Sequence, residues 1–346
     1  MRNMKLIVIL GQTSTGKSDF AVEIAQEIKG LNQSKRLIAR TSQSEVLGEI
    51  ISADSRQVYK GMDLGTGKIT KKEMRGIPHH LLDVASPSRV FSVTDFQKKA
   101  LKKIEEINKR NKIPILCGGT GFYIDAIVNG TIFPKVPPNK VLREKLSRKT
   151  ASELFEILKK LDKNRAGSID KNNSVRLIRA IEIAKALGKV PNLKTYTETN
   201  SAIAEFVSDS KSVFFSNFEV LKIGLVIPDE VLKERIKVRL LARIKKGMLR
   251  EMENLHKAGL SWKRMESLGL EYRYGALYLQ KIKNLPSQML QQAKDEMIEK
   301  INTKTWHYAK RQKTWFKRDQ NTIWINPLKK SDKAKALKEV KKFLKV

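Results

Sequence analysis

The chain has 346 residues, enough for one large domain with an insertion or for two domains, and its single cysteine, Cys117, excludes an intramolecular disulfide. The early apolar run of residues 6–10 is too short to span a membrane and leads into a glycine-rich turn, so we expect a cytoplasmic protein with no signal peptide and no membrane partner. The net charge is +33, from 69 Lys and Arg against 36 Asp and Glu. This charge favours a nucleic-acid partner over an enzyme that acts on small metabolites alone. The alternative is that it reflects only a lysine-rich composition.

The first half of the chain alternates predicted strands and helices. Buried strands are expected at Lys5–Leu10, Glu49–Ala53 and Ile113–Cys117, since each is a short apolar run. Apolar residues at helical spacing predict a helix from Lys17, with Phe20, Ile24 and Ile28 on one face, and another over Phe96–Asn108. Residues 30–48 are polar and basic and predict a surface insertion. The alternation predicts a mostly parallel sheet with ligands at the carboxyl ends of its strands.

The second half begins with a purely helical pattern. Residues 141–188 predict helices only, and a polar stretch follows at 195–216. A strand is expected at Lys222–Ile227, stopped by Pro228, with Asp229 as the N-cap of the next helix. A basic, aromatic helical part (286–318), a short strand (322–325) and a lysine-rich amphipathic tail close the chain. We therefore predict an α/β core of residues 1–136 and 217–346 with a helical insertion domain, residues 137–216.

A glycine-rich motif joins the first strand to the first helix. It matches the full P-loop pattern and reads Gly11-Gln12-Thr13-Ser14-Thr15-Gly16-Lys17-Ser18. In such a loop, backbone N–H groups and the helix N-terminus cradle anionic oxygens, a lysine adds a point charge, and the Ser18 hydroxyl suits Mg²⁺. Because the flanking elements are also those the motif requires, the sequence predicts a polyphosphate site here.

Asp54 ends the second strand, which in a parallel sheet places its carboxylate beside the P-loop. The position suits a general base or a metal-associated carboxylate. An aspartate that caps the following turn is the alternative. The polar residues Ser55, Arg56 and Gln57 at this end of the strand favour the functional interpretation.

Three further groups of residues have open interpretations. Arg235, Arg239 and Arg243 recur every four residues beside an apolar stripe of Leu232, Ile236 and Leu240, which indicates either a guanidinium clamp on phosphate or a solvated helix face. Arg176 and Arg179 share a predicted helix whose other face is Val175, Ile178 and Ile181. Residues 310–318 mix basic side chains with Trp315 and Phe316, as suits an RNA backbone grip with base stacking, although Trp315 could equally pack into the core.

His79 and His80 do not predict a metal site. Adjacent histidines on an extended segment point to opposite sides, and no Cys or His cluster completes a ligand set. We expect them to be structural or to form hydrogen bonds in a loop. Cys117 is expected to be a core residue at a strand end.

The motifs and their order resemble those of the tRNA dimethylallyltransferase (tRNA isopentenyltransferase) family. The resemblance covers most of the chain and rests on residues 11–18, 54–66, 76–83, 118–123, 175–180, the helix of Arg235 and Arg239, and residues 309–316. It implies a P-loop NTPase-like parallel sheet flanked by helices, with a helical insertion domain that contacts tRNA. It also implies transfer of a dimethylallyl group from dimethylallyl diphosphate to N6 of the adenine at tRNA position 37, beside the anticodon, with Mg²⁺ as cofactor. The anticodon stem-loop of tRNA is then the macromolecular partner, and a monomer is expected.

The resemblance also implies roles for individual residues. Asp54 would take the N6 proton, and Lys17 and Arg239 would stabilise the leaving diphosphate. The diphosphate would be held by the P-loop residues Gly11, Gln12, Thr13, Ser14, Thr15, Gly16, Lys17 and Ser18, the last with Mg²⁺, and by Arg235. The tRNA would be contacted by Asp54, Ser55, Arg56, Gln57, Thr120, Arg143, Val175, Arg176, Leu177, Ile178, Arg179, Lys310, Arg311, Gln312, Lys313, Trp315 and Lys317.

The sequence departs from the family pattern in three segments. Residues 30–48 are longer than usual, residues 267–272 are a variant of the family's Gly-Tyr pattern, and residues 195–216 match poorly. A P-loop kinase of a small metabolite would explain residues 11–18 and the arginine helix equally well, but neither the net charge nor residues 310–318. A non-catalytic RNA-binding protein with a nucleotide switch is a third hypothesis, against which Asp54 counts.

Overall fold

The computed structural model describes residues 4–39, 47–192 and 218–345. These residues belong to two compact units, one formed by Met1–Val128 with Val213–Val346 and one by Asn129–Ser212. The second unit starts at Asn129, earlier than the predicted boundary at 137. The reason is that the segment before its first helix is tied to this unit, since Val136 O accepts a hydrogen bond from Arg179 and Asn139 N donates one to Glu182.

The first unit is built on a sheet whose strands are all parallel. Within the described residues the strand order is β3-β2-β4-β1-β5-β6. The strands are β1 (Met4–Gly11), β2 (Gly48–Ser52), β3 (His79–His80), β4 (Ile113–Gly118), β5 (Phe218–Leu225) and β6 (Thr322–Ile325). Residues 6–10 of β1 are almost wholly buried, as expected for a central parallel strand covered on both faces. The loops after β1, β2 and β4 therefore meet at one edge of the sheet.

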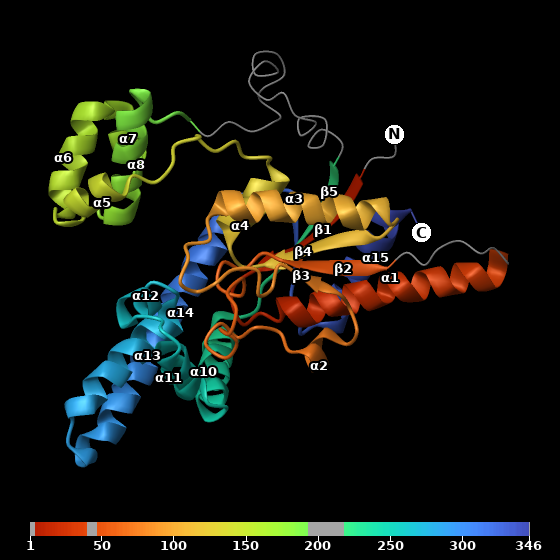
Figure 1. The fold of residues 1–346 in the computed structure, drawn as a ribbon. Helices are drawn as coiled ribbons and strands as arrows, with labels where there is room; N and C mark the ends of the chain where they lie inside the picture. Colours follow the sequence, from red (N-terminus) through yellow and green to blue (C-terminus); the bar gives the residue numbers. More distant parts are fainter. Residues whose placement is uncertain (1–3, 40–46, 193–217, 346) are drawn as a thin grey trace. The chain divides into compact units, whose positions relative to one another are not determined.

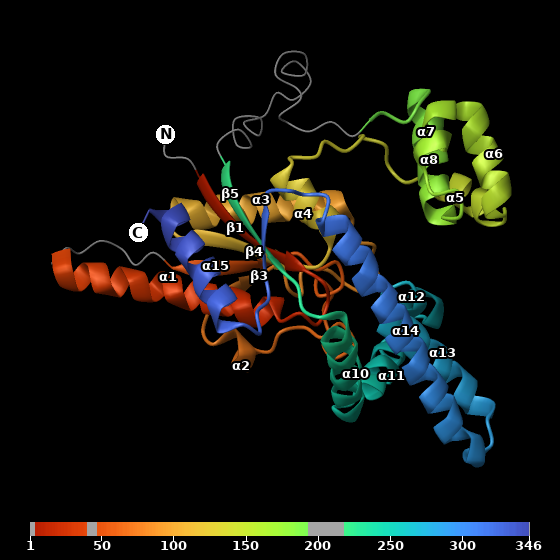
Figure 2. The ribbon, with the colours of Figure 1, turned by 180° about the vertical axis from the view of Figure 1, so that it is seen from behind.

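Helices cover both faces of this sheet (Figures 1 and 2). On one face pack α1 (Lys17–Ala39), through Phe20, Ile24 and Ile28, and α15 (Lys330–Leu344), through Ala336 and Val340. On the other face pack α3 (Val93–Lys109) and α4 (Gly121–Val128). The buried positions of α3, Phe96, Ala100, Ile104 and Ile107, have helical spacing, which explains why the sequence predicts this helix.

A second group of helices lies beyond the carboxyl ends of the strands (Figure 1). It contains α10 (Asp229–Lys245), α11 (Met248–Lys257), α12 (Trp262–Glu266), α13 (Leu270–Lys281) and the long α14 (Leu290–Phe316). Short elements complete the unit: α2 (Lys71–Met74), η2 (Ile282–Asn284) and η3 (Ser287–Met289). These helices share a core of Met, Leu and Tyr side chains, including Met252 and Tyr272, that also buries Val58 and Met62 from the loop after β2.

Within the described residues of the second unit, all regular elements are helices. It consists of α5 (Lys140–Ser147), α6 (Ala151–Leu161), α7 (Lys163–Ser168) and α8 (Ser174–Leu187). Leu154, Leu158, Leu177 and Ile181 form the centre of its core. The purely helical pattern of residues 141–188 is therefore confirmed.

Most predicted elements are confirmed, and one predicted helix cap is wrong. Residues 30–39 continue α1 as far as Ala39, while residues 40–46 and 195–216 lie outside the described residues, so the surface insertion expected at residues 30–48 stays a prediction. Asp229 is the first residue of α10 rather than its N-cap, which is Pro228 and forms no side-chain cap hydrogen bond. The charge of Asp229 at the first turn still suits the helix dipole.

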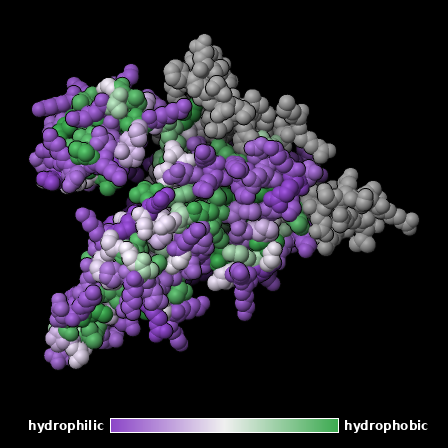
Figure 3. Space-filling view, in the orientation of Figure 1, coloured by the Kyte–Doolittle hydropathy of each residue, from purple (hydrophilic) through white to green (hydrophobic). Residues whose placement is uncertain are grey.

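The surface agrees with the charged composition. Hydrophilic residues cover much of the face shown in Figure 3. Among the described helices, none is both long and apolar enough to cross a membrane.

Candidate active site

A cavity of about 880 Å³ lies at the carboxyl ends of the strands, within the first unit. One side is the P-loop with the ends of β2 and β4, lined by residues such as Thr13, Lys17, Ser18 and Asp54. The facing side is the loop of residues 61–70 together with α10. A volume of this size suits a ligand of the size of a nucleotide or a prenyl diphosphate.

The P-loop has the backbone that its glycines allow. Gly11 and Gly16 have φ angles of 139° and 91°, and Ser14 also has a positive φ of 61°. A Cβ at Gly11 would lie 2.5 Å from Leu225 O, so the neighbouring strand leaves room for glycine only. Within the loop, Thr15 Oγ1 donates to Gln12 O at 2.8 Å. The loop is therefore fixed locally, and Thr13, Ser14, Gly16, Lys17 and Ser18 line the cavity.

Lys17 folds back over this loop. Its Nζ donates to Gln12 O at 2.5 Å. Burial, and to a lesser degree the nearby Arg239, lower its pKa to about 8, against the opposing effects of Cys117 and Asp54. Among the described residues no carboxylate is bonded to this buried ammonium, which lines the cavity, and a buried charge without a counter-ion is unfavourable. An anionic ligand in the cavity would supply that counter-ion.

Helix α14 packs against the back of the P-loop, and two glutamines, Gln312 of α14 and Gln12 of the loop, form hydrogen bonds between helix and loop. Gln312 is buried; its Oε1 accepts from Thr13 N at 2.8 Å, and its Nε2 donates to Gly119 O at 2.7 Å. Gln12 is buried as well and donates to Ala309 O at 3.2 Å. The N–H of Thr13 is therefore occupied by protein, and the side chain of Gln12 points away from any ligand in the loop.

Asp54 lines the cavity and also caps a turn. Its Oδ1 accepts from the backbone N–H groups of Arg56 at 2.8 Å and Gln57 at 3.4 Å. The two interpretations of Asp54 are thus compatible, because the turn holds the carboxylate at the cavity. Next to it, Ser55 N donates to Thr120 Oγ1 at 3.0 Å, which joins the ends of β2 and β4.

The arginines of α10 face the cavity in a row. Leu232, Ile236 and Leu240 are buried as predicted, and Arg235, Arg239 and Arg243 line the cavity. A Cβ at Gly16 would lie 4.0 Å from Arg235 Nη1, so Arg235 reaches toward the P-loop.

Arg239 and Arg243 contact the loop after β2. Arg239 Nη2 donates to Gly67 O at 2.9 Å, and burial of its guanidinium, followed by the charge of Arg243, lowers the pKa of Arg239. Arg243 donates to Gly65 O at 3.1 Å and to Glu271 at 2.9 Å. The three arginines therefore form one positively charged side of the cavity, in which Arg239 and Arg243 are held by hydrogen bonds, rather than a solvated helix face.

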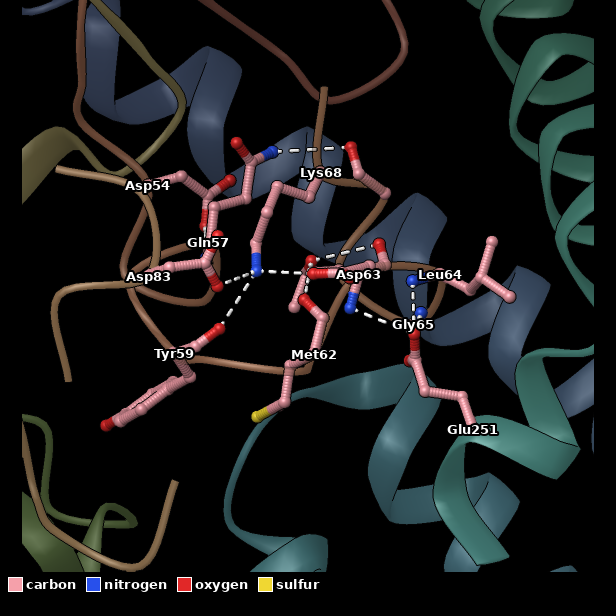
Figure 4. A network of polar contacts seen from close by, with 12 residues as sticks. Asp54, Gln57, Tyr59, Met62, Asp63, Leu64, Gly65, Lys68, Asp83 and Glu251 are labelled. Atoms are coloured by element: carbon pink, nitrogen blue, oxygen red, sulfur yellow. Dashed lines mark hydrogen bonds and ion pairs between the residues drawn. The ribbon is translucent and has the colours of Figure 1, made fainter. Parts of the chain in front are cut away.

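The loop after β2 is held by two charged centres that the sequence did not reveal (Figure 4). The side chain of Lys68 is almost buried, and its Nζ donates to Asp63 and Asp83, both at 2.6 Å, and to Tyr59 O at 2.9 Å. Glu251 of α11 accepts hydrogen bonds from the backbone of residues 63–65. Neither residue belongs to a motif of fixed spacing. Their partners do fall within residues 54–66 and 76–83, which belong to the sequence motifs described above.

The predicted tRNA-binding residues of the first unit fall into two groups. Lys310 and Arg311 on α14 and Lys317, the residue after it, are exposed, while Lys313 forms an ion pair with Asp229 at 3.0 Å. Trp315 is half-buried against the sheet core, and its Nε1 donates to Asp125 at 2.9 Å. The structure thus favours the core role for Trp315, and the burial of Gln312 leaves its side chain no free polar atom for RNA.

In the second unit, the buried carboxylate of Glu182 binds two of the arginines predicted to contact tRNA, Arg143 and Arg179. Glu182 accepts from Arg143 Nη2 at 2.8 Å and from Arg179, and these hydrogen bonds outweigh burial and lower its pKa to about 2. Arg176 is exposed and Ile178 is half-buried. The predicted apolar face needs correction: Leu177 is buried and Val175 is exposed, because α8 turns Leu177 and Ile181 toward the core.

The two histidines and the cysteine have the structural roles expected. His79 and His80 form the edge strand β3; His79 Nδ1 bonds Ile77 O and His80 Nε2 bonds Glu49. Cys117 is buried at the end of β4, where burial raises the pKa of its thiol. Among the described residues, no group of three or more His, Cys, Asp or Glu side chains could hold a metal ion.

An all-parallel sheet with a P-loop after its central strand defines a protein of the P-loop class. Comparison with known proteins narrows this class. A model of the IPP transferase family matches residues 57–319. The tRNA dimethylallyltransferase 2 of Treponema denticola is 41% identical over 322 residues, which cover 92% of this chain and 94% of that protein.

Solved structures agree with this assignment. The tRNA isopentenylpyrophosphate transferase of Bacillus halodurans is 30% identical, with a TM-score of 0.63 over 99% of this chain and 95% of that one. A eukaryotic dimethylallyltransferase acting on tRNA is 24% identical and shows the same fold, with a TM-score of 0.68 over 97% of this chain and 77% of that one. The chain belongs to the IPP transferase family.

Proposed function

We propose that this protein transfers a dimethylallyl group from dimethylallyl diphosphate to N6 of the adenine at tRNA position 37, beside the anticodon, and releases diphosphate. The observation that supports this most directly is that the P-loop, Asp54 and Arg239 line one cavity in a chain of the IPP transferase family. The cavity has both the cations to bind a diphosphate and a carboxylate to accept a proton. The net charge of +33 suits an RNA substrate.

The diphosphate occupies the P-loop side of the cavity in this proposal. Backbone N–H groups of the loop and the N-terminus of α1 bind its oxygens, and Lys17, Arg235 and Arg239 supply positive charge. The bond between the allylic carbon and the diphosphate oxygen breaks as the bond to N6 forms. Charge that develops on the departing diphosphate is met by cations already in place, which lowers the barrier.

Asp54 acts as the general base. The exocyclic amine of adenine is a weak nucleophile and becomes cationic as it is alkylated, so a carboxylate that accepts its proton helps the reaction. The turn of residues 54–57 holds this carboxylate at the cavity. Adenine reaches it only when it leaves its stack, which suits recognition of a splayed anticodon loop.

The residues at the P-loop fit Mg²⁺ bound mainly through the substrate. Ser18 and Asp19 line the cavity with Asp54, and all three offer the oxygen ligands that Mg²⁺ prefers. Since Mg²⁺ is held by few protein ligands together with substrate phosphates and water, a dense cluster of carboxylates is not needed. When bound, the ion neutralises diphosphate charge.

We propose contacts to tRNA on each of the two units, taken separately. In the first unit these are Lys310, Arg311 and Lys313 of α14 and Lys317 just after it, together with Ser55, Arg56, Gln57 and Thr120 at the strand ends. Arg143, Val175, Arg176, Ile178 and Arg179 are the proposed contacts in the second unit. Leu177 and Gln312 are better described as supports, because both are buried. We propose that the protein acts in the cytoplasm as a monomer.

One assay tests the proposal against a metabolite kinase and against a non-catalytic switch. The protein is incubated with unmodified tRNA and dimethylallyl diphosphate, and the RNA is digested and examined by mass spectrometry. We expect a prenylated adenosine from the anticodon loop that depends on protein, tRNA and added Mg²⁺. Absence of this product together with steady ATP consumption would support the kinase instead.

A further inference from the structure

The loop between β2 and β3 has few backbone partners of its own around residues 63–67. This segment, Asp-Leu-Gly-Thr-Gly, lies outside the regular helices and strands, yet it lines the cavity through Asp63, Leu64, Thr66 and Gly67. A wall of this kind needs other groups to satisfy its N–H and C=O groups. The hydrogen-bond partners of residues 63–67 therefore determine how rigidly this side of the cavity is positioned.

A single carboxylate binds the N–H groups of three consecutive residues in this loop. Glu251 Oε2 accepts from Asp63 N at 3.0 Å and from Leu64 N at 2.7 Å, and Oε1 accepts from Gly65 N at 3.0 Å. Figure 4 shows the Glu251 side chain rising from its helix to these groups. Successive N–H groups that converge in this way form an anion-binding nest, and here the anion is part of the protein.

Tyr272 fixes the carboxylate from the other side. Its hydroxyl donates to Glu251 Oε1 at 2.5 Å, and the tyrosine is buried. Burial, and then the charge of Glu251, raise the pKa of Tyr272, so the hydroxyl remains a donor. A Cβ at Gly65 would lie 2.4 Å from the Tyr272 ring, which shows how closely the loop is seated on this pair.

The carbonyl groups of the same loop are held by the arginine row. Arg243 donates to Gly65 O and Arg239 donates to Gly67 O at 2.9 Å. A Cβ at Gly67 would lie 2.5 Å from Arg239 Nη2. A shift of the loop would therefore remove the acceptor that orients the Arg239 guanidinium.

We propose that Glu251 is a positioning residue: it fixes residues 63–67 through their N–H groups and thereby sets the orientation of Arg239 toward the diphosphate. Glu251 itself is not among the residues that line the cavity, so it acts through the loop. This inference rests on the proposed function, in which Arg239 binds the diphosphate of the prenyl donor. It adds a residue on α11 that no motif indicates.

The test compares Glu251→Gln with Glu253→Gln, an exposed carboxylate of the same helix. An amide offers one acceptor instead of two and turns an NH₂ group toward the loop. Binding of inorganic diphosphate is measured by calorimetry, and transfer is measured as KM for dimethylallyl diphosphate and kcat. We expect Glu251→Gln to weaken diphosphate binding and to raise KM by about tenfold, the factor of one charge-assisted hydrogen bond, and Glu253→Gln to change neither.

A double-variant cycle separates positioning of Arg239 from a general loss of structure. Glu251→Gln in an Arg239→Gln background should weaken diphosphate binding by less than about twofold, because the orientation it disturbs is already lost. An additive, tenfold further loss would overturn the proposal, as would wild-type affinity in Glu251→Gln itself.

Tyr272→Phe provides a milder variant if Glu251→Gln does not fold. It removes one hydrogen bond to the carboxylate and should weaken diphosphate binding by about threefold, with a circular dichroism spectrum like that of the wild type and a somewhat lower melting temperature. Unchanged affinity in folded Tyr272→Phe would then count against the proposal. If the wild type binds diphosphate but transfers no prenyl group, the proposed function fails, while the binding comparison still decides the role of Glu251.

Discussion

The P-loop is one unbroken stretch of residues after β1, whereas the wall that faces it draws on the loop after β2 and on α10, with support from α11 and α13. In the P-loop the contacts that shape the loop itself are local, since Thr15 and Lys17 both donate to Gln12 O, and α14 supports it from behind. In the facing wall the contacts span the chain, as between Glu251 and Leu64 or between Arg243 and Gly65. The first region is a backbone cradle, and the second is an assembly of charged side chains.

This difference separates two tasks. A backbone cradle binds any polyphosphate, since N–H groups and a lysine recognise charge and not identity. The facing wall shapes the rest of the cavity and orients Arg239. We therefore expect substitutions in the P-loop to affect the binding of any polyphosphate, and substitutions in the facing wall to affect diphosphate affinity and transfer through the placement of Arg239.

The largest effect is expected at Asp54, which lies beside the P-loop at the end of β2. Asp54→Asn keeps an acceptor for the turn but removes the base, so the transfer rate should fall by about 10³-fold while tRNA binding persists. Single-turnover transfer and a filter-binding titration measure the two quantities. Full activity in this variant would show that the carboxylate only caps the turn of residues 54–57.

A smaller effect is expected in the facing wall, where two arginines stand one turn apart on α10. Arg239→Gln should lower kcat/KM by about 100-fold, because it removes a cation placed at the developing charge. Arg235→Gln, the matched variant, should lower it by about tenfold. Steady-state kinetics on both variants measure the two losses of kcat/KM. A larger loss in Arg235→Gln than in Arg239→Gln would show that Arg235, which reaches toward Gly16, is the main arginine at the diphosphate.

The pH dependence of diphosphate binding reports the electrostatic interaction between Lys17 in the P-loop and Arg239 in the facing wall. Because the pKa of Lys17 is lowered to about 8, its ammonium is lost as the pH rises through that value, and affinity should fall by up to about tenfold per pH unit above it. Calorimetry with inorganic diphosphate between pH 7 and 10 measures this fall. Since Arg239 contributes to lowering the pKa of Lys17, Arg239→Gln should move the fall to higher pH.

An unshifted pH profile in Arg239→Gln would mean that the two walls do not interact through charge. Lys17→Arg is the control for the titrating group, because an arginine stays charged over this range and should abolish the fall.

The smallest effects are expected on α14, outside the cavity. Lys310→Gln and Arg311→Gln should each weaken tRNA binding by a few fold at moderate salt and reduce the salt slope by about one, without changing the KM for dimethylallyl diphosphate. Lys342→Gln on α15 is an exposed control and should leave the slope unchanged. A slope that is flat in the wild type would show that the net charge is only compositional.

What could be predicted from the sequence also divides into features that depend on local spacing and features that depend on long-range contacts. Strands β1, β2 and β4 and the buried faces of α1 and α3 were predictable, because apolar spacing reports burial directly. Val175 was placed on the wrong face of α8, because its apolar character alone did not show that Leu177 and Ile181 form the buried side. Glu251 and Lys68 were missed because a charged residue in a helix or loop is usually solvated, and only their partners reveal their roles.

By itself, the sequence determined the P-loop, its flanking strand and helix, and the arginine row of α10, since each depends on residues a few positions apart. Only the tertiary structure decided what faces the P-loop and what holds it in place. Gln312 reaches Thr13 and Gly119 across the fold, and Glu251 reaches three N–H groups of a loop far away in the chain. The physical reason is that a hydrogen bond depends on distance in space, and folding brings together partners that no local spacing connects.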